Sequence, residues 1–554
     1  MKKTFLALAI LLITLKVYAT DYYWVNGSGN WNDFSGHWAT TSGGNTFHST
    51  SPTYNDNVFF DQYSFLSALN QVTITSDVYC AHFYFDNTLN AEIKCDISSR
   101  EFQIWGDITI NAPFNFSYDG ILTVASNSFI KSSATAFNGQ LKFNAIGSQI
   151  NLVDNFISTN SIDLNGIVFN TLDNEFRFNN MILANNYIST LKFGASNVYF
   201  SGDLVSSNLS HICDFDSATL FYTDSAVMTL RPDFIHKIVC TNEPGVELKY
   251  CDVDSIFIIN SSKLIFENGH CQYVNFQGPT GDSCFIGIAE FAEIGFFDGS
   301  ADSSAKWTMW VNFYSNISKL ISAQDCFFSG DNFNGGTAHI DTVLCKKNAE
   351  FYYYYPGMVN SQISIDYLEI EGNGIYCYMD CGFLNLHPNT QHIFRNEFAI
   401  TIDSISAIGL PGQEISFSSD LGGIQDTVIM AKDFCGDYLN ISDMYIIGGA
   451  NYTAGTNSTD AGNNTGWNFN SCLINVDELL NNLNLISYPN PAHEYIYFNE
   501  PVDQIRIFDL AGKLILSSQE KGMFSLNIAS LKQNYYTIEL INKNGSARRK
   551  LIVY

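Results

Sequence analysis

The sequence is poor in charged residues and poorest in basic ones. Asp, Glu, Lys and Arg make up 15% of the 554 residues, and 27 Lys and Arg stand against 55 Asp and Glu, a formal net charge of −28. Without a basic surplus the chain cannot displace counterions from phosphates, so the composition excludes nucleic acid as a partner. Anionic membrane surfaces repel the chain for the same reason.

Long apolar runs and familiar catalytic motifs are missing as well. Beyond residue 19, no window holds about 18 consecutive apolar residues, as a membrane-spanning helix would require. There is no G-x-S-x-G elbow, no H-E-x-x-H motif and no phosphate-binding or dinucleotide-binding loop. The sequence therefore identifies no catalytic residue, no cofactor and no metal-ligand set.

Aromatic residues are as frequent as charged ones. They make up 15% of the chain, with 30 Tyr and 44 Phe. Burial of aromatic surface on this scale offsets chain entropy, so the composition is not that of a disordered protein. Charged helix formers are few, whereas Phe, Tyr, Ile and Thr favour strands. The composition predicts an all-β fold, and the length predicts more than one domain.

The segment over residues 1–19 has the pattern of a signal peptide. Lys2 and Lys3 precede an apolar stretch over residues 5–15, and Val17-Tyr18-Ala19 fits a cleavage site. The alternative, a membrane anchor, needs a run of about 20 residues, which is longer than this one. We expect the mature chain to begin near Thr20 with 24 basic and 55 acidic residues, a net charge of −31.

Short alternating apolar stretches recur through the middle of the chain. Successive starts differ by 19, 20, 21, 14 and 15 residues. Strand repeats of about 20 residues are typical of a β-solenoid, in which each coil buries its face against the next. We therefore predict a right-handed parallel β-helix over residues 102–470; a large antiparallel sandwich would show the same alternation. The starts are Phe102, Ile121, Leu141, Ile162, Phe176 and Leu191.

Thirteen cysteines, an odd number, are spread along the chain. Cys80 and Cys271 are each followed by apolar residues three and five positions later, so we interpret such cysteines as small core residues at strand starts. Disulfides are the alternative in an exported protein. Zinc is disfavoured because Cys377-x3-Cys381 has no second pair at matching spacing. The candidate disulfides are Cys377/Cys381, Cys240/Cys251 and Cys435/Cys472.

Acidic residues suggest two further alternatives. Two carboxyls at a suitable separation are the machinery of many glycosidases. Asp252/Asp254 and Asp214/Asp216 have the i, i+2 spacing that places two carboxylates on one strand face, although 55 acids produce such pairs by chance. The loop over residues 331–336 carries hard oxygen ligands and glycines, but it lacks the full EF-hand pattern. A solvated corner is the simpler interpretation of this loop.

The C-terminal segment has a different pattern. Residues 471–482 form a connector, and short alternating runs follow at residues 495–498, 504–508, 513–516, 524–528, 535–540 and 550–554. Turn residues separate several of these runs. The spacing predicts a small antiparallel β-sandwich over residues 483–554.

Four motifs in this segment carry a family resemblance. They are Tyr488-Pro-Asn-Pro491, the stretch from Ile505 through Gly512 to Ile515, Tyr536-Thr-Ile-Glu-Leu540 and Arg548-Arg-Lys550. Together they resemble the C-terminal sorting domain of type IX secretion substrates of the Bacteroidota. Asn534 stands where the family usually has Gly, and Asn also tolerates left-handed backbone. An ordinary immunoglobulin-like tail is the alternative.

The resemblance implies a partner, a location and a set of motif residues. The partner is the type IX secretion machinery, and the location is the exterior or the outer-membrane surface. There the domain is removed or the chain is attached to surface polysaccharide. The sorting-motif residues that it implies are Pro489, Asn490, Pro491, Gly512, Arg548, Arg549 and Lys550.

The N-terminal segment resembles the opening of repetitive adhesin-like surface proteins of the same bacterial group. Tyr22-Tyr-Trp24 leads through Gly27 and Gly29 to Trp31 and Trp38. We interpret the three Trp as a hydrophobic cap within residues 20–101; exposed Trp rings would instead stack on sugars. Short Asp-Ser/Thr-apolar stretches resemble the O-glycosylation motif of this bacterial group, although several such matches arise by chance; they begin at Asp216, Asp224, Asp254, Asp341, Asp403 and Asp426.

These observations leave two classes of function. The first is an exported structural or adhesin-like protein that contacts surface glycans. The second is a polysaccharide lyase or hydrolase on a β-helix scaffold, which the low Lys and Arg content disfavours. A solenoid face lined by neutral Asn, Thr and Tyr would favour the first class, and a cleft of clustered acids with Arg or Lys would favour the second.

Overall fold

The computed structural model describes residues 19–553, apart from residues 66, 68–69, 87–90, 113–115, 185, 207–210, 224–225, 230–233, 242–245, 290, 312–314, 330–336, 353–361, 378, 396–399, 472–484, 486, 510–512 and 544. In this part of the chain the one helix, α1 (Phe34–His37), has four residues, and no helix is long and apolar enough to cross a bilayer. Two compact units divide between Phe469 and Asn470, here called the body and the tail. Apart from Ala19, the predicted signal peptide lies outside the described residues.

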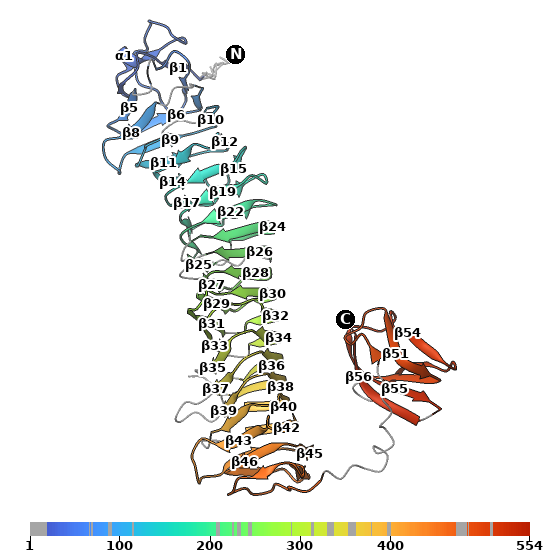
Figure 1. Ribbon diagram of the computed structural model, residues 1–554. Helices are drawn as coiled ribbons and strands as arrows, with labels where there is room; N and C mark the ends of the chain where they lie inside the picture. The colour runs from blue at the N-terminus through green and yellow to red at the C-terminus, as the bar shows by residue number, and fades with distance from the viewer. Residues whose placement is uncertain are drawn as a thin grey trace, which may run out of the picture. The chain divides into compact units, whose positions relative to one another are not determined.

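The body is a β-solenoid whose strands pair in parallel with strands of the next coil (Figure 1). The parallel pairing excludes the antiparallel sandwich. One ladder of strands, here called sheet II, runs along the body. Its strands are β6 (Val78–Cys80), β9 (Glu101–Ile104), β11 (Ile121–Val124), β14 (Gln140–Phe143), β17 (Ile162–Leu164), β20 (Met181–Leu183), β23 (Leu204–Ser206), β25 (Ala226–Thr229), β27 (Val246–Lys249), β29 (Lys263–Glu267), β31 (Ser283–Ala289), β33 (Lys306–Val311), β35 (Asp325–Ser329), β37 (Ala349–Tyr352), β39 (Gly374–Cys377), β41 (Gln391–Phe394), β43 (Ile415–Ser419), β46 (Leu439–Ser442) and β49 (Thr459–Asp460).

The predicted alternation holds in sheet II. In β14, Leu141 and Phe143 are buried on either side of Lys142, which faces outward. Leu141 pairs with Leu122 one coil earlier and with Ile162 one coil later. The evenly spaced starts predicted from Phe102 to Ile162 are thus successive coils of one sheet. Their inward side chains belong to one continuous core that runs from Tyr22 to Ala454.

The opposite side of the solenoid, sheet I, has two short strands per coil in its first part. Phe176 and Leu191 lie in these strands, which is why the last two predicted intervals are shorter than a coil. The first set is β1 (Asp21–Trp24), β4 (Asn57–Phe60), β7 (Phe83–Phe85), β10 (Ile108–Ile110), β12 (Ser128–Lys131), β15 (Gln149–Leu152), β18 (Val168–Asn170) and β21 (Thr190–Lys192). The second set is β13 (Ala136–Phe137), β16 (Phe156–Ser158), β19 (Phe176–Phe178) and β22 (Asn197–Phe200).

The two sets merge at β24 (Ile212–Tyr222). Its first residues pair with β21 and its last residues pair with β22, so one long strand replaces two short ones. From here each coil contributes one long strand to sheet I and one strand to sheet II. The long strands that follow are β26 (Phe234–Thr241), β28 (Val253–Ile259), β30 (His270–Gln277), β32 (Glu293–Gly299), β34 (Asn316–Ser322), β36 (Thr337–Cys345), β38 (Gln362–Ile370), β40 (Met379–Leu386) and β42 (Ile400–Ala407).

Each long strand bends where two consecutive side chains face outward. In β36, Ile340 and Val343 are buried, whereas Asp341 is exposed and Thr342 is half-buried. Strict alternation forbids two outward neighbours on a straight strand, so the backbone turns there. The same order of buried residues, at positions one, four and six, recurs from β26 to β40. The sequence pattern that starts at Cys271 is one instance of it.

The long strand divides again near the end of the body. β42 pairs with β44 (Asp426–Ile429), and β44 pairs with β47 (Met444–Ile447). A separate pair, β45 (Phe434–Cys435) and β48 (Tyr452–Thr453), restores the third face. The body therefore has three faces at its ends and two in its middle.

A cluster of three Trp closes the N-terminal end of the body. Trp24, Trp31 and Trp38 are all 0% exposed, and Trp38 lies edge-on to both of the others at 4.9 to 5.0 Å. Full burial excludes stacking of these rings on sugars. Short strands frame the cluster: β2 (Gly29–Asn30), β3 (Trp38–Ala39), β5 (Gln71–Ile74) and β8 (Glu92–Cys95). Parallel pairing already begins here, between β1 and β4.

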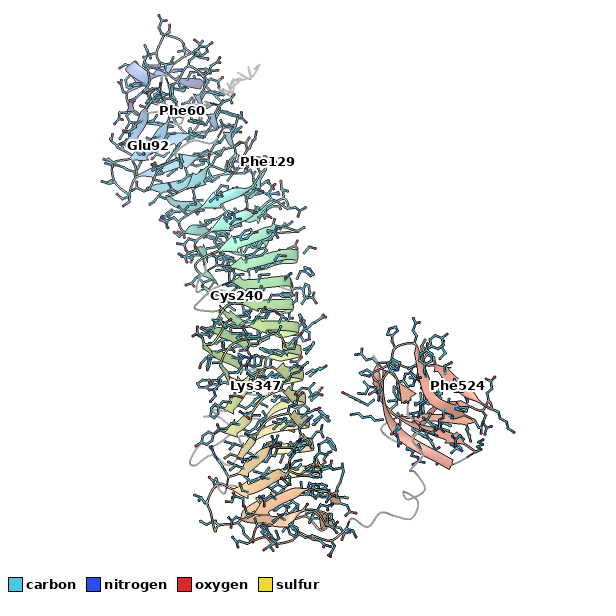
Figure 2. The ribbon with its side chains drawn as sticks, viewed as in Figure 1. Phe60, Glu92, Phe129, Cys240, Lys347 and Phe524 are labelled. Atoms are coloured by element: carbon cyan, nitrogen blue, oxygen red, sulfur yellow. The ribbon has the colours of Figure 1, made fainter. Side chains whose placement is uncertain are left out.

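Eleven of the described cysteines are thiols, and ten of these are buried. The interpretation as small core residues is confirmed, and Cys240, labelled in Figure 2, is 1% exposed. The candidate disulfides Cys377/Cys381 and Cys240/Cys251 are not formed, because all four side chains are thiols that fill the interior. Cys80 also differs from the prediction, since it ends its strand instead of starting it.

One cysteine does form a disulfide. Cys435, which lies in β45, is disulfide-bonded. Cys472, the partner that the sequence suggests for it, lies outside the described residues.

The tail consists of two antiparallel sheets around its own core, as predicted. Two strands differ most from the predicted runs: β51 continues to Val502 instead of ending at Phe498, and the last strand begins at Gly545 and not near Lys550. One sheet contains β50 (Ser487–Tyr488), β51 (Tyr495–Val502) and β54 (Met523–Asn527). The other contains β53 (Leu514–Ser518), β52 (Gln504–Phe508), β55 (Asn534–Asn542) and β56 (Gly545–Val553).

Candidate functional site

The outer face of sheet II carries a column of neutral polar side chains near the C-terminal end of the body. Gln391 in β41 pairs with Ser416 in β43, which pairs with Asn440 in β46, which pairs with Thr459 in β49. Gln391, Ser416 and Asn440 lie at outward positions, because the residues on either side of each are buried, and Thr459 at the end of the column is exposed. Alternation and parallel register thus align one polar group per coil.

This column lines a groove, here called the polar groove. Its main hollow has a volume of about 510 Å³. A second hollow of about 300 Å³ shares Asn373 and Gln391 with it, so the two are continuous. The residues around the main hollow are Asn373, Asn389, Thr390, Gln391, Glu414, Ser416, Asn440, Asn457 and Thr459.

Side chains from successive coils tie the rim of the groove to the backbone. Asn348 Oδ1 accepts the Asn373 N–H at 2.8 Å, and Asn373 Oδ1 accepts the Gln391 N–H at the same distance. Asp325 begins the series by accepting the Asn348 N–H at 3.2 Å. Because the Asn373 oxygen is used by the scaffold, its amide NH₂ is the group that it offers to a ligand.

The charges near the groove are compensated by neighbours. Glu350, beside the smaller hollow, forms an ion pair with Arg395 at 3.0 Å. The Lys306 Nζ lies 5.0 Å from the centre of the Phe327 ring. Among the described residues around the main hollow, Glu414 is the one carboxylate, and it accepts the Gly412 N–H at 3.0 Å. The residues around the main hollow therefore do not supply the two carboxylates that glycosidases use.

A buried histidine supports the groove from below. His392 is 0% exposed; its Nδ1 lies 2.9 Å from Tyr376 Oη and its Nε2 lies 2.8 Å from Thr390 Oγ1. The Thr390 hydroxyl donates to the His387 carbonyl oxygen at 2.6 Å, so it accepts from His392 Nε2–H. Burial lowers the pKa of His392 to about 3. The ring is therefore neutral at pH 7 and positions Thr390 on the groove.

We expect the body to lose stability in acid through His392. The unfolded side chain binds a proton below pH 6.5, whereas the folded one does so only near pH 3. The depressed pKa therefore makes the free energy of unfolding fall as the pH falls below 6.5, by about 3 kcal/mol at pH 4.5. Denaturant titrations followed by Trp fluorescence measure this in the body, because all seven Trp precede residue 470.

Two histidine substitutions separate this effect from general acid sensitivity. His392→Gln should flatten the dependence between pH 7 and 4.5, whereas His270→Gln, at an exposed position, should leave it unchanged. An unchanged slope in His392→Gln would contradict the assignment.

Of the two acidic pairs that the sequence singled out, Asp252/Asp254 and Asp214 are described, and the side chain of Asp216 lies outside the described part of the structure. Asp252 and Asp214 are exposed on the outer surface of sheet I. Asp252 Oδ1 accepts the His270 N–H at 2.9 Å, and Asp254 Oδ2 lies 3.5 Å from His236 Nδ1. These contacts are those of a solvated strand edge. The candidate calcium loop at residues 331–336 lies outside the described residues.

Three of the Asp-Ser/Thr-apolar motifs fall at the bends of the long strands. Their Asp and Ser/Thr face outward, and the third residue faces the core. Asp426 differs, because it is 1% exposed and burial raises its pKa to about 6. The bend thus places these three motifs on the outer surface of sheet I. The three are at Asp254, Asp341 and Asp403.

In the tail, the Pro-Asn-Pro motif contacts the basic last strand. Asn490 Nδ2 donates to the Lys550 carbonyl oxygen at 2.7 Å, and Asn490 Oδ1 accepts the Ile552 N–H at 2.8 Å. One side-chain amide therefore ties the loop with Pro489 and Pro491 to β56. Two predicted motifs from opposite ends of the tail sequence meet at this point.

The basic residues of the last strand have different surroundings. Glu539, which is 7% exposed, receives Arg548 Nε at 3.0 Å and Arg506 Nη1 at 3.1 Å. Lys550 Nζ lies 4.6 Å from the centre of the Tyr535 ring. Arg549 Nη1 donates to the carbonyl oxygen of Arg548. Gly512 lies outside the described residues.

Comparison with known proteins identifies a family for the tail. Residues 487–554 match the family model of the secretion system C-terminal sorting domain. No curated protein matches the chain, and no solved structure matches it. The structure and this match define an exported protein, a β-solenoid that carries a type IX sorting domain at its C-terminus. Such a domain directs a chain to the cell surface or the exterior through the type IX secretion machinery.

Proposed function

We propose that the body is an adhesin-like glycan-binding element and that the polar groove is its binding surface. The observation that carries the proposal is the lining of the main hollow, which is amide and hydroxyl groups with one carboxylate. Sugar hydroxyls both donate and accept hydrogen bonds, and side-chain amides match them with both kinds of group. The net charge of the chain disfavours anionic polysaccharides, so the proposed ligand is a neutral glycan.

The spacing of the groove suits an extended glycan. Gln391, Ser416, Asn440 and Thr459 stand on successive coils, which lie about 4.7–4.9 Å apart as in other sheets. A sugar chain that lies along the solenoid axis would meet one polar group per coil. Because the coils are held by backbone hydrogen bonds, little order has to be gained on binding.

Glycan binding by the body also requires that the body reach the outside of the cell. We infer that residues 1–19 direct the chain across the inner membrane and are removed. The sorting-motif residues of the tail then present β56 and the Asn490 loop to the type IX machinery. The order of events leaves the body outside the cell, where glycans are accessible.

A glycan array probed with the mature chain, followed by calorimetry on the best neutral glycan, tests the binding site. Asn440→Ala and Gln391→Ala should each weaken binding by about tenfold, since each removes hydrogen bonds worth roughly 1–1.5 kcal/mol. Asn197→Ala, an outward residue of sheet I, should have no effect.

A parallel assay for released reducing sugars separates binding from catalysis. Binding without release supports the proposal. Equal binding by wild type and both groove variants, or release of sugar ends, would overturn it.

A further inference from the structure

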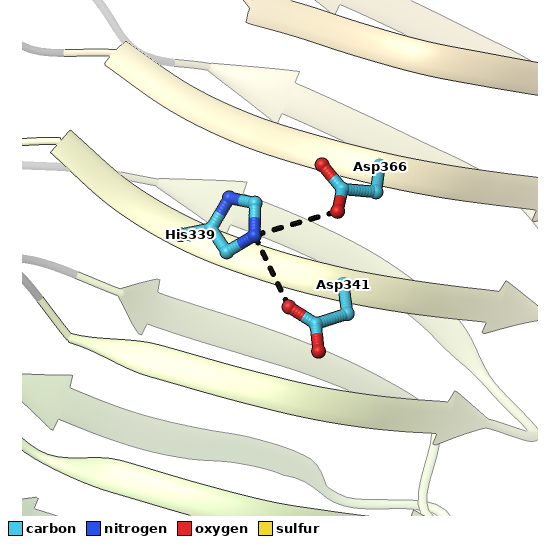
Figure 3. A group of neighbouring side chains, drawn as sticks. All are labelled: His339, Asp341 and Asp366. Atoms are coloured by element: carbon cyan, nitrogen blue, oxygen red, sulfur yellow. Dashed lines mark ion pairs between the residues drawn. The ribbon is translucent and has the colours of Figure 1, made fainter. Parts of the chain in front are cut away.

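A histidine and two aspartates gather on the outside of sheet I, on two adjacent coils. His339 and Asp341 flank the buried Ile340 in β36, so both face outward. Asp366 stands at the equivalent bend of β38, because Ile340 pairs with Ile365 and Thr342 pairs with Tyr367. Figure 3 shows the imidazole ring between the two carboxylates.

The distances are close to those of a metal-ligand set. His339 Nε2 lies 3.1 Å from Asp341 Oδ1 and 3.6 Å from Asp366 Oδ2. Ligand atoms around a tetrahedral zinc ion, with bonds of about 2.0–2.1 Å, stand roughly 3.3 Å apart. The three candidate ligand atoms lie within 4.8 Å of one another. The side chains of the two carboxylates are 54% and 67% exposed, so solvent leaves them room to rotate toward an ion.

The negative charge of the cluster favours the binding of a cation. The two carboxylates face each other across neighbouring strands, an arrangement that repels. One imidazole supplies at most a single positive charge, so the cluster stays negative in either state of His339. Lys319 on the preceding coil, which pairs with Thr342, lies with its Nζ 5.0 Å from the centre of the Phe296 ring. A divalent ion that bridges the coils would balance the charge.

Other histidines on the surface meet only one carboxylate. His236 lies 3.5 Å from Asp254 at the corresponding bend of earlier coils, and His387 lies 2.9 Å from Glu369. Within the described residues, the cluster of His339, Asp341 and Asp366 is the one place where three such side chains share one point.

We propose that His339, Asp341 and Asp366 bind a divalent transition-metal ion of the zinc class and thereby link two coils of the solenoid. An imidazole with two carboxylates suits zinc better than calcium or magnesium, which prefer all-oxygen sets. Water completes the coordination, as in open zinc sites. The site is on sheet I and the polar groove is on sheet II, so neither proposal depends on the other.

Calorimetry on the mature chain, stripped of metal with a chelator, tests the site with zinc chloride as the probe. One zinc ion per chain should bind, and an excess of calcium or magnesium should not displace it. Asp366→Asn and His339→Gln should each lower the affinity at least about tenfold, the least that even an outer-sphere partner contributes. His236→Gln, the matched histidine with one carboxylate, should bind zinc as the wild type does.

Thermal unfolding followed by Trp fluorescence gives a second readout. Zinc should raise the midpoint of the wild type and of His236→Gln, because an ion that binds only the folded state stabilises it. It should leave Asp366→Asn unchanged. All three side chains are solvent-exposed or nearly so, so the variants should fold, and their far-UV spectra verify this. Zinc binding that is equal in the wild type and in Asp366→Asn, or no binding at all, would overturn the proposal.

Discussion

Deleting residues 483–554 should abolish the appearance of the protein outside the cell and leave the body folded within the cell envelope. The tail has its own hydrophobic core and the body has another, and the two share no core residue. We therefore expect the body to keep its own core when the tail is deleted. Quantitative immunoblots of medium, cell surface and periplasm measure the effect, and extracellular protein should fall to background. Protease resistance of the retained body verifies that it is folded.

A single substitution tests which part of the tail export depends on. Asn490→Ala removes both hydrogen bonds to β56, which together contribute roughly 1–3 kcal/mol, and should reduce export in step with the loss of tail stability. Lys521→Ala, an exposed turn residue between β53 and β54, should export normally. Normal export of the chain without its tail would refute the role of the sorting domain.

Replacing Trp38 by Ala should destabilise the body by about 3–5 kcal/mol, the usual cost of removing a buried Trp. The ring packs against Trp24, Trp31 and Phe60, and its Nε1 donates to the Trp31 carbonyl oxygen at 2.6 Å. A coil of a solenoid is stabilised only by its neighbours, so loss of the terminal cluster opens one end of the core to water. Denaturant unfolding followed by circular dichroism measures the change.

Trp105→Ala is the matched control. Trp105 is 44% exposed and packs against Tyr54 at 5.7 Å, so its removal should cost less than about 1 kcal/mol. Similar losses in the two variants would show that the Trp cluster does not close the core. A rise in aggregation of Trp38→Ala alone would agree with an opened strand end.

Alternation and repeat length were enough to predict the β-solenoid. Four starts, at Phe102, Ile121, Leu141 and Ile162, mark one sheet because those coils are nearly equal in length. The change from three faces to two could not be predicted from the sequence, because β24 looks there like two short strands with Asp216 and Ser217 between them. Only the partners of its two halves show that it is a single strand.

The candidate site was beyond sequence analysis for a related reason. The polar groove depends on which residues of successive coils share a register, and the coils differ in length there. The step along the chain from Gln391 to its partner Ser416 is longer than the step from Asn440 to its partner Thr459. No fixed period aligns these positions. The residues of the proposed zinc site could not be predicted from the sequence for the same reason, although Asp341 belongs to one of the Asp-Thr-apolar motifs.

The long strands share one order of buried residues. Because of this, whole coils could be gained or lost without disrupting the core of the body. The segment from Val253 to His270 could be lost as a whole, because Cys271, Val274 and Phe276 would then occupy the places of Val253, Ile256 and Ile258 against β26. Each duplication or loss of this kind changes the span of the molecule by one strand spacing, about 4.8 Å. The body is thus a spacer whose reach can be tuned in small steps, with the N-terminal Trp cluster and the C-terminal pair of β45 and β48 kept intact.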